Sequence, residues 1–150
     1  MFTRPSVKDR SFMSVLPEIV EEVRRWIEKA ENDFRNAEYV LKMEEDCPFD
    51  TVCYHCQQCV EKYLKALLIY RSVDFPRTHD IVVLFNMLKN PDSSKLDIGV
   101  IQPLNRYSIE ARYPGYWDPI RKEEAENAIR AARAFRVAVR KILDELLSEK

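Results

Sequence analysis

Apolar residues recur every three or four positions along most of this chain, which is the spacing of one face of an α-helix. The first such stripe predicts a helix from Glu18 to about Glu45, and the next predicts a helix from Thr51 to Arg71. Asp50 is expected to cap the second helix, because its carboxylate accepts hydrogen bonds from the first free backbone N–H groups. The first stripe consists of Ile19, Val23, Trp26, Ile27, Ala30, Phe34, Ala37 and Leu41.

Three further helices are predicted in the second half of the chain. A short helix is expected over residues 79–89, with Thr78 as its cap. An intermediate segment over residues 98–112 follows, in which Pro103 either makes the first turn irregular or is the residue at which the helix begins. A last helix is expected from Pro119, the favoured residue for a first helical position, to about Leu147. Two long helices, one intermediate and two shorter ones, joined by short loops, predict an all-α bundle.

Length and composition limit the classes of protein to consider. The 150 residues are enough for one domain. Residues 1–16 lack periodicity and are expected to be a tail or arm, with a single domain over 17–150. Two glycines in the whole chain argue against a glycine-rich phosphate loop. The net charge of −1 means that nucleic-acid affinity would need a local basic patch. Without a membrane span or signal peptide, a cytoplasmic location is expected, away from membranes.

The cysteines allow two interpretations. Cys53, Cys56 and Cys59 have the C-x2-C-x2-C spacing of some iron–sulfur ligands, and His55 and Cys47 lie near them. Such ligands converge from an irregular loop, whereas this run lies inside a continuous helical pattern. A step of three residues keeps each thiol within the apolar arc of the helix. Core packing is therefore favoured, and we expect no metal and no cofactor.

The two histidines are the natural candidates for acid–base chemistry. His79 stands at a predicted helix start, beside Arg77 and Asp80. It suits an acid or base, or alternatively a residue that caps the helix or anchors its loop. His55 borders the polar arc of the second helix and is expected at the surface or at a partner contact.

Two groups of side chains could contact nucleic acid. An arginine stripe on the last helix fits either a solvated salt-bridge face or a phosphate-contacting surface. An aromatic cluster interleaved with arginines fits either a packed corner or a platform for unpaired bases. The arginine stripe is formed by Arg130, Arg133, Arg136 and Arg140. The aromatic cluster is formed by Tyr107, Tyr113, Tyr116 and Trp117, with Arg106 and Arg112.

Four segments in order resemble the HEPN family, the helical domains of higher eukaryotic and prokaryotic nucleotide-binding proteins. The first contains Ala30, Asp33, Phe34 and Ala37. The second runs through Tyr54, Gln57, Gln58, Glu61, Lys62, Lys65 and Ala66. The third contains His79, Leu84 and Leu88, and the fourth contains Tyr107, Arg112, Tyr113 and Pro114. The resemblance covers roughly residues 20–147.

This resemblance implies a five-helix up-and-down bundle that commonly forms a homodimer. It also implies partnership with a minimal nucleotidyltransferase, often as a toxin–antitoxin pair. Many family members are metal-independent ribonucleases with an R-x4-6-H motif. This sequence departs from that motif, because no arginine stands five to seven positions before His55, and Arg71 and Arg77 stand eight and two positions before His79.

Two functions remain open. In the favoured one, a non-catalytic dimeric module binds a nucleotide or RNA phosphate or docks a nucleotidyltransferase. In the alternative, a ribonuclease toxin uses His79 as the base and Arg112 or Arg77 to stabilise the phosphorane-like charge. Dimerisation is also suggested by Ile69 and Tyr54 on the polar arc of the second helix. The favoured function places binding contacts at Gln57, Glu61, Lys62, Lys65, Arg106, Tyr107, Arg112 and Tyr113.

Overall fold

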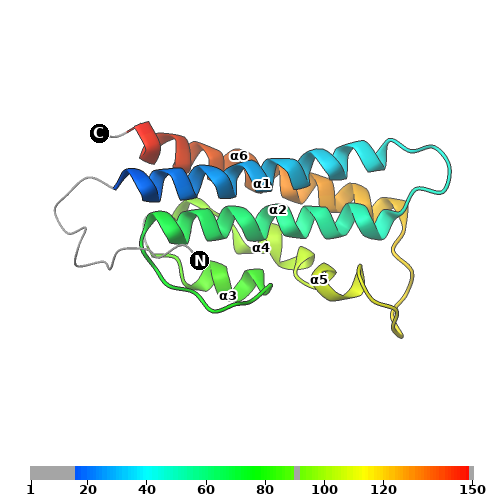
Figure 1. Cartoon of the computed structure of the whole chain (residues 1–150). Helices are drawn as coiled ribbons and strands as arrows, with labels where there is room; N and C mark the ends of the chain where they lie inside the picture. Colours follow the sequence, from blue (N-terminus) through cyan, green and yellow to red (C-terminus); the bar gives the residue numbers. More distant parts are fainter. Residues whose placement is uncertain (1–15, 90–91, 149–150) are drawn as a thin grey trace.

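The computed structural model describes residues 16–89 and 92–148 and confirms the predicted all-α bundle. Its body consists of the three long helices α1 (Pro17–Leu41), α2 (Phe49–Tyr70) and α6 (Lys122–Ser148). Figure 1 shows α2 between α1 and a row of short helices. No strand occurs in the described ranges, and none of their helices is both long and apolar enough to cross a membrane. The expected arm over residues 1–16 lies outside these ranges, except for Leu16.

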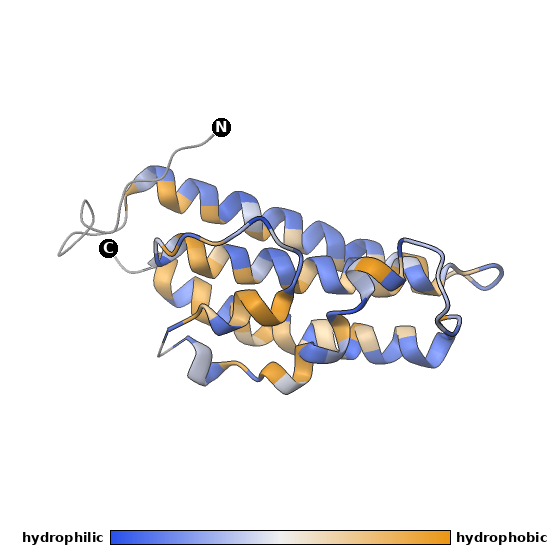
Figure 2. Ribbon diagram, turned by 90° about the horizontal axis from the view of Figure 1, so that it is seen from below, coloured by the Kyte–Doolittle hydropathy of each residue, from blue (hydrophilic) through white to orange (hydrophobic). Residues whose placement is uncertain are grey.

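Helix α2 is the centre of the bundle. Sixteen of its 22 residues are buried, because α2 contacts α1, α6, α3 (Ile81–Asn86) and α5 (Tyr107–Glu110). The two other long helices are amphipathic, with a hydrophobic side toward the bundle and a hydrophilic side outward (Figure 2). The core therefore surrounds α2, and polar residues on α2 are covered by the same neighbours as its apolar ones.

The cysteines of α2 are part of this core. Cys53, Cys56 and Cys59 are fully buried free thiols. Burial raises the pKa of Cys53 to about 12 and also raises the pKa of Cys56 and of Cys59. Within the described ranges, no group of three His, Cys, Asp or Glu residues could hold a metal ion. The spacing that resembles an iron–sulfur motif is thus a row of small core residues.

The helix ends differ from the sequence-based predictions. Helix α1 stops at Leu41 rather than Glu45. Helix α2 begins at Phe49, so Asp50 lies in its first turn and is not its cap. Helix α3 is shorter than predicted and is capped by Asp80 rather than Thr78. The Asp80 carboxylate accepts hydrogen bonds from the backbone N–H groups of the second and third residues of α3.

The segment predicted as one helix over residues 98–112 is divided into short pieces. Helix α4 (Ile98–Ile101) is followed by a 3-10 turn, η3 (Gln102–Leu104), and then by α5. Pro103 explains the break, because proline lacks the N–H group that a continuous helix needs. A second 3-10 turn, η2, covers Ser93–Lys95. Pro119 precedes α6 by three positions, so the predicted start of the last helix was too early.

Candidate functional site

A groove of about 760 Å³ lies beside α5 and is called here the His79 groove. One wall is the loop before α3, and the other comes from the segment that includes η3 and α5. The groove brings His79 together with three arginines, Arg77, Arg106 and Arg112. The first wall consists of Arg77, Thr78, His79 and Asp80 of the loop with Val82 of α3, and the opposite wall of Gln102, Asn105, Arg106, Ser108, Ile109, Arg112 and Tyr113.

A reciprocal pair of hydrogen bonds holds the two walls together. The Asn105 side-chain amide donates to the Asp80 carboxylate at 2.9 Å, and the Ile81 backbone N–H donates to Asn105 Oδ1 at 2.9 Å. Asp80 is also the cap of α3, so the same carboxylate begins the helix and fixes the groove. Asn105 could not be predicted as a site residue, because no local sequence pattern links it to a residue 25 positions earlier.

His79 lies on the surface of the groove but is anchored from beneath. Its side chain is 60% exposed, and its Nδ1 lies 3.0 Å from Glu61 Oε1. In the neutral imidazole whose proton is on Nδ1, this proton is donated to the carboxylate, and Nε2 is the acceptor. The backbone carbonyl of His79 accepts a hydrogen bond of 2.8 Å from the Gln57 amide. Helix α2 thus positions both the ring and the backbone of His79.

The polar residues of α2 beneath His79 are buried, including three of the predicted binding residues, Gln57, Glu61 and Lys65. Gln57, Gln58, Glu61 and Lys65 are at most 9% exposed. Gln58 Nε2 lies 2.8 Å from Gln57 Oε1 and 3.0 Å from Glu61 Oε1. Lys65 Nζ donates to Glu61 Oε2 at 3.0 Å. The Glu61 carboxylate is stable in this position because its neighbours satisfy it with an ammonium and hydrogen bonds.

The hydrophobic surroundings of Lys65 complete this support. Its ammonium lies 5.6 Å from the centre of the Trp26 ring and 5.7 Å from the centre of the Phe75 ring. Aromatic faces attract a cation at this distance. Lys65 is therefore held on one side by rings and on the other by Glu61, and it lies below the groove rather than in it.

The arginines of the groove differ in how far neighbouring carboxylates neutralise their positive charge. The Arg112 guanidinium lies 5.5 Å from the Tyr54 ring centre and 5.0 Å from that of Tyr113. Hydrogen bonding to the two phenols raises the pKa of Arg112, which stays charged. Arg106 is paired with Glu110 and Glu124, so much of its charge is already compensated. Arg112 and Arg77, both exposed, are the cations best placed for a ligand.

Tyr107 is buried beside the groove and supports its wall. It is 4% exposed, and its hydroxyl donates to Glu124 at 2.5 Å. Burial raises the pKa of the Tyr107 hydroxyl. Tyr107 and Glu124 together fix Arg106 against α6, beside the groove. By contrast, Tyr113 is 52% exposed and available to a ligand.

Comparison with known proteins identifies the family. A family model described as HEPN domain matches residues 23–142. This chain belongs to the HEPN domain family. A protein of Methanocaldococcus jannaschii, named "Putative toxin MJ1304", is 30% identical over 142 residues, which cover 84% of this HEPN domain chain and 91% of the relative.

Two solved structures have the same fold as this HEPN chain. TT1696 from Thermus thermophilus is 25% identical with a TM-score of 0.67, and the match covers 79% of this chain and 96% of that one. ST0689, described as an archaeal HEPN homologue, is 24% identical with a TM-score of 0.59, over 81% of this chain and 97% of that one. The four sequence segments that suggested HEPN membership lie within the matched region.

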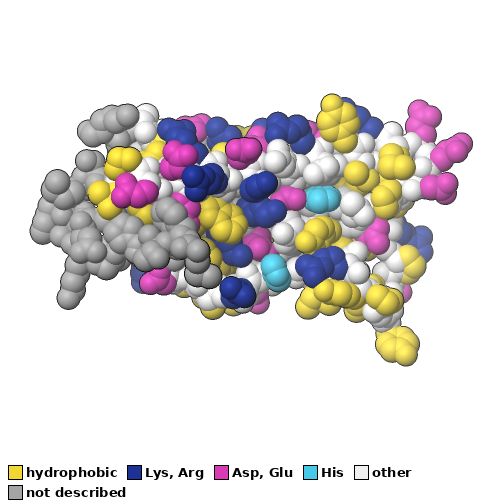
Figure 3. Space-filling view, in the orientation of Figure 1, with side chains coloured by type: hydrophobic (Ala, Val, Ile, Leu, Met, Phe, Trp, Pro, Cys, Tyr) yellow, Lys and Arg dark blue, Asp and Glu magenta, His cyan; other side chains and the backbone are white. Residues whose placement is uncertain are grey.

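A second polar cluster of this HEPN domain lies between α1 and α2. Asp33 accepts a hydrogen bond of 2.6 Å from Lys62 Nζ and lies 2.8 Å from His55 Nδ1. The side chains of Lys62 and His55 are each 24% exposed, and both contact Asp33 of α1. Figure 3 shows both histidines on one face of the molecule, among Lys and Arg side chains. Lys62, a predicted binding residue, thus belongs to the Asp33 cluster and does not line the His79 groove.

The arginine stripe of α6 forms salt bridges, mostly with α1. Arg133 pairs with Glu38 at 3.1 Å, and Arg136 pairs with Glu31 at 2.7 Å. Arg140 lies 3.4 Å from Asp144 on α6 and also faces Glu31. Arg133, Arg136 and Arg140 therefore form the salt-bridge face that was one of the two predicted alternatives.

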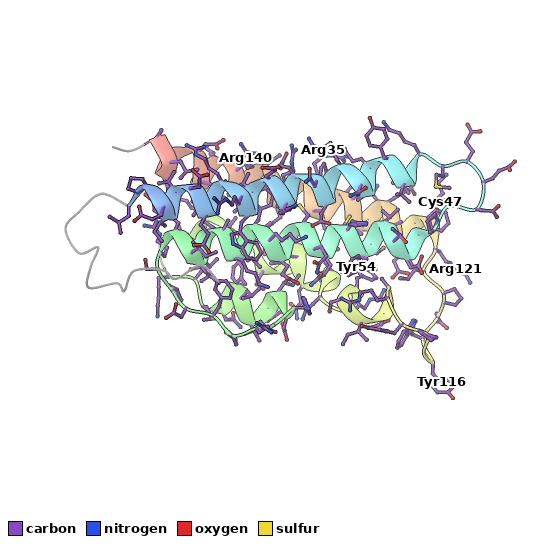
Figure 4. The ribbon with its side chains drawn as sticks, in the orientation of Figure 1. Arg35, Cys47, Tyr54, Tyr116, Arg121 and Arg140 are labelled. Atoms are coloured by element: carbon purple, nitrogen blue, oxygen red, sulfur yellow. The ribbon has the colours of Figure 1, made fainter. Side chains whose placement is uncertain are left out.

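Ile69 and Tyr54, the two residues that suggested a dimer contact, differ in their surroundings. Ile69 is 1% exposed, so it packs in the core and offers no surface to a partner. Tyr54 lies against Arg112, and Figure 4 shows it beside α5. Tyr116, in contrast, projects from the loop before α6 and is fully exposed (Figure 4).

Proposed function

We propose that this HEPN domain binds single-stranded RNA, or a nucleotide derived from it, in the His79 groove. The observation that carries the proposal is the convergence of His79, Arg77, Arg112 and Tyr113 on one groove. Guanidinium groups bind phosphate oxygens through paired N–H donors, and an exposed tyrosine ring stacks on an unpaired base. Arg112 and Arg77 hold the phosphate, and Tyr113 orients the base.

The buried predicted residues take supporting roles in this proposal. Gln57, Glu61 and Lys65 fix the position of His79, and Tyr107 fixes Arg106. Lys62 contributes positive charge at the edge of the Asp33 cluster. The affinity for RNA depends on these supporting residues although they do not contact the RNA themselves.

We also propose the partners that membership of the HEPN family suggests. The domain acts as a homodimer with a minimal nucleotidyltransferase, as one half of a toxin–antitoxin pair. The toxin name of the Methanocaldococcus jannaschii relative supports this biological setting. Light scattering at tens of micromolar tests the dimer, and a mass of one chain, near 17.8 kDa, contradicts it.

The binding proposal is tested with a fluorescently labelled single-stranded RNA and the Arg112→Ala variant. Removing Arg112 takes away a phosphate contact, so affinity falls about tenfold and its dependence on salt becomes shallower. The matched control is Arg35→Ala, because Arg35 is an exposed arginine of α1 that bonds only to its neighbour Asn32 among the described contacts. Equal affinities of wild type and Arg112→Ala contradict the proposal.

A second function, RNA cleavage without a metal, is favoured by the contact between His79 and Glu61. A carboxylate on Nδ1 orients an imidazole so that Nε2 accepts the proton of the 2′-hydroxyl. The 2′-oxygen then forms a bond to phosphorus, and the bond to the 5′-oxygen breaks, with a proton from water completing the leaving hydroxyl. Arg112 or Arg77 stabilises the extra charge on the phosphoryl oxygens. The product carries a 2′,3′-cyclic phosphate.

Cleavage of labelled total tRNA in excess EDTA separates the two functions. Under the cleavage hypothesis, wild type gives cyclic-phosphate ends and His79→Ala reduces the rate at least about a hundredfold. His55→Ala is the control, since this histidine belongs to the Asp33 cluster. Binding without cleavage above the His79→Ala background contradicts the ribonuclease and leaves the binding function.

A further inference from the structure

A second recess adjoins the His79 groove and shares two of its residues. Its volume is about 510 Å³, within the range typical of small-ligand sites. It lies between the start of α2 and the loop that joins α5 to α6. Arg112 and Tyr113 line both cavities, so a ligand that passes Arg112 can occupy the two at once. The recess and the groove are therefore neighbouring compartments of one surface.

Aromatic side chains give the recess the walls that a flat ring needs. Phe49, Tyr113 and Trp117 come from the two sides of the recess, together with prolines of the loop. The Trp117 ring lies directly against Gly115, where the Cβ of any other residue would overlap it. Gly115 therefore allows Trp117 to adopt this position. Nucleobases stack on such aromatic surfaces when they are unpaired.

The polar groups of the recess select among the bases. Its lining includes two carboxylates, Asp50 and Glu110, and one cation, Arg112. Asp50 accepts a backbone N–H from Thr51, and Glu110 accepts from Arg106. A carboxylate has about four lone-pair sites, so each retains capacity to accept more hydrogen bonds. Two carboxylates repel phosphate, which therefore stays at Arg112, and they attract a base edge made of N–H donors.

Guanine fits this requirement better than the other bases. Its N1–H and exocyclic N2–H₂ present adjacent donors to one carboxylate, which can accept both. Adenine and cytosine present a single exocyclic amine beside an acceptor, and uracil presents one N–H between two acceptors. A carboxylate gains one hydrogen bond from each of those bases and two from guanine.

We infer that the recess formed by Phe49, Asp50, Glu110 and Trp117 is a guanine-specific subsite for the nucleotide next to the phosphate at Arg112. This inference rests on the proposed binding of RNA in the His79 groove. The domain prefers guanine at this position, and the preference comes from two carboxylates that lie outside that groove.

The test uses uridine tetranucleotides that carry one G, A or C, with affinities measured for the full chain. The G-containing tetranucleotide binds about tenfold more tightly than the A, C and all-U forms. Asp50→Asn and Glu110→Gln each reduce this preference, and together they abolish it. Affinity for the all-U form changes less than about twofold in Asp50→Asn, whereas Glu110→Gln also releases Arg106 of the groove and is therefore compared only by its ratio of G to all-U affinity. The control is Asp118→Asn, which neutralises an exposed carboxylate in the same loop but outside the recess.

A second variant tests the aromatic wall. Gly115→Ala forces the Trp117 ring out of its position, so the preference for G falls while circular dichroism reports an unchanged helical fold. Equal affinities for the four tetranucleotides, or a G preference that persists in the double carboxylate variant, overturns the guanine subsite and leaves the binding function standing. If wild type binds none of the four, the binding function is overturned and the subsite with it.

Discussion

At the scale of single residues, Glu61 links the interior to the candidate site. It is 3% exposed, yet one oxygen lies against the exposed His79 and the other accepts from the buried Lys65. Removing the charge at position 61 therefore acts in two places. The groove loses the group that orients its histidine, and the core retains an ammonium without a counter-charge.

We expect Glu61→Gln to lower the free energy of unfolding by about 3 kcal/mol, because Lys65 then remains buried without an ionic partner. Urea unfolding of the two proteins measures the difference. Adding Lys65→Met to Glu61→Gln recovers most of the loss, since no unpaired charge is left. Glu28→Gln, an exposed substitution on α1, is the control. A double variant no more stable than Glu61→Gln alone contradicts this account.

The cysteine thiols allow a prediction about reactivity. Because burial raises the pKa values of Cys53, Cys56 and Cys59, their thiolate forms are scarce at neutral pH. Iodoacetamide should therefore leave these three residues unmodified in the native protein and alkylate them in guanidinium. Cys47, half-buried near Lys122, reacts before them. Mass spectrometry of the peptides gives the order, and native modification of Cys56 contradicts it.

At the scale of elements, α6 is joined to α1 by salt bridges on the surface above the core. Arg136 donates through both Nε and a terminal nitrogen to the two oxygens of Glu31. Tyr63 of α2 also donates its hydroxyl to Glu31, so one carboxylate connects three helices. The hydrogen bond from Arg136 is the main cause that lowers the pKa of Glu31 below its ordinary value.

A lowered pKa fixes the direction of the pH effect. Glu31 contributes stability above its ordinary pKa of 4.5, and this contribution is lost as the pH falls through the lower folded-state value. Glu31→Gln should therefore cost about 1 kcal/mol near neutral pH, a modest amount because water screens the pair. It should also reduce the acid sensitivity of unfolding below about pH 4.5. Urea unfolding from pH 7 to 3 checks both effects, and parallel pH profiles for the two proteins contradict them.

The long helices could be predicted from the sequence because each carries an uninterrupted apolar stripe. The break at Pro103 was expected as an irregularity, but its extent depends on packing against α6. The burial of Gln57 and Glu61 could not be predicted, since a helical wheel shows which residues are polar but not whether a distant loop covers them. For the same reason His79 and Arg112 could each be predicted as candidate residues, but their proximity could not. The hydrogen bond between Asn105 and Asp80, which holds the two walls of the His79 groove together, was also not predictable.

At the scale of the whole molecule, stability depends on the central helix α2, which packs against both other long helices. Leu64 is fully buried in the C-terminal half of α2. We expect Leu64→Ala to cost about 3 kcal/mol, because it leaves a cavity that the surrounding helices cannot close. Val137→Ala, on the exposed side of α6, should change the free energy of unfolding by less than about 0.5 kcal/mol. Denaturant titrations of both variants give the comparison, and equal losses contradict the central role of α2.

The two tryptophans have different surroundings, which gives the molecule two intrinsic optical reporters. Trp26 lies against the Lys65 ammonium, beneath His79, and Trp117 lies in the recess beside the loop. A single-tryptophan protein with Trp117→Phe reports on the buried ion pair, and one with Trp26→Phe reports on the recess. Their emission spectra, followed during a titration, separate events inside the bundle from events at its rim.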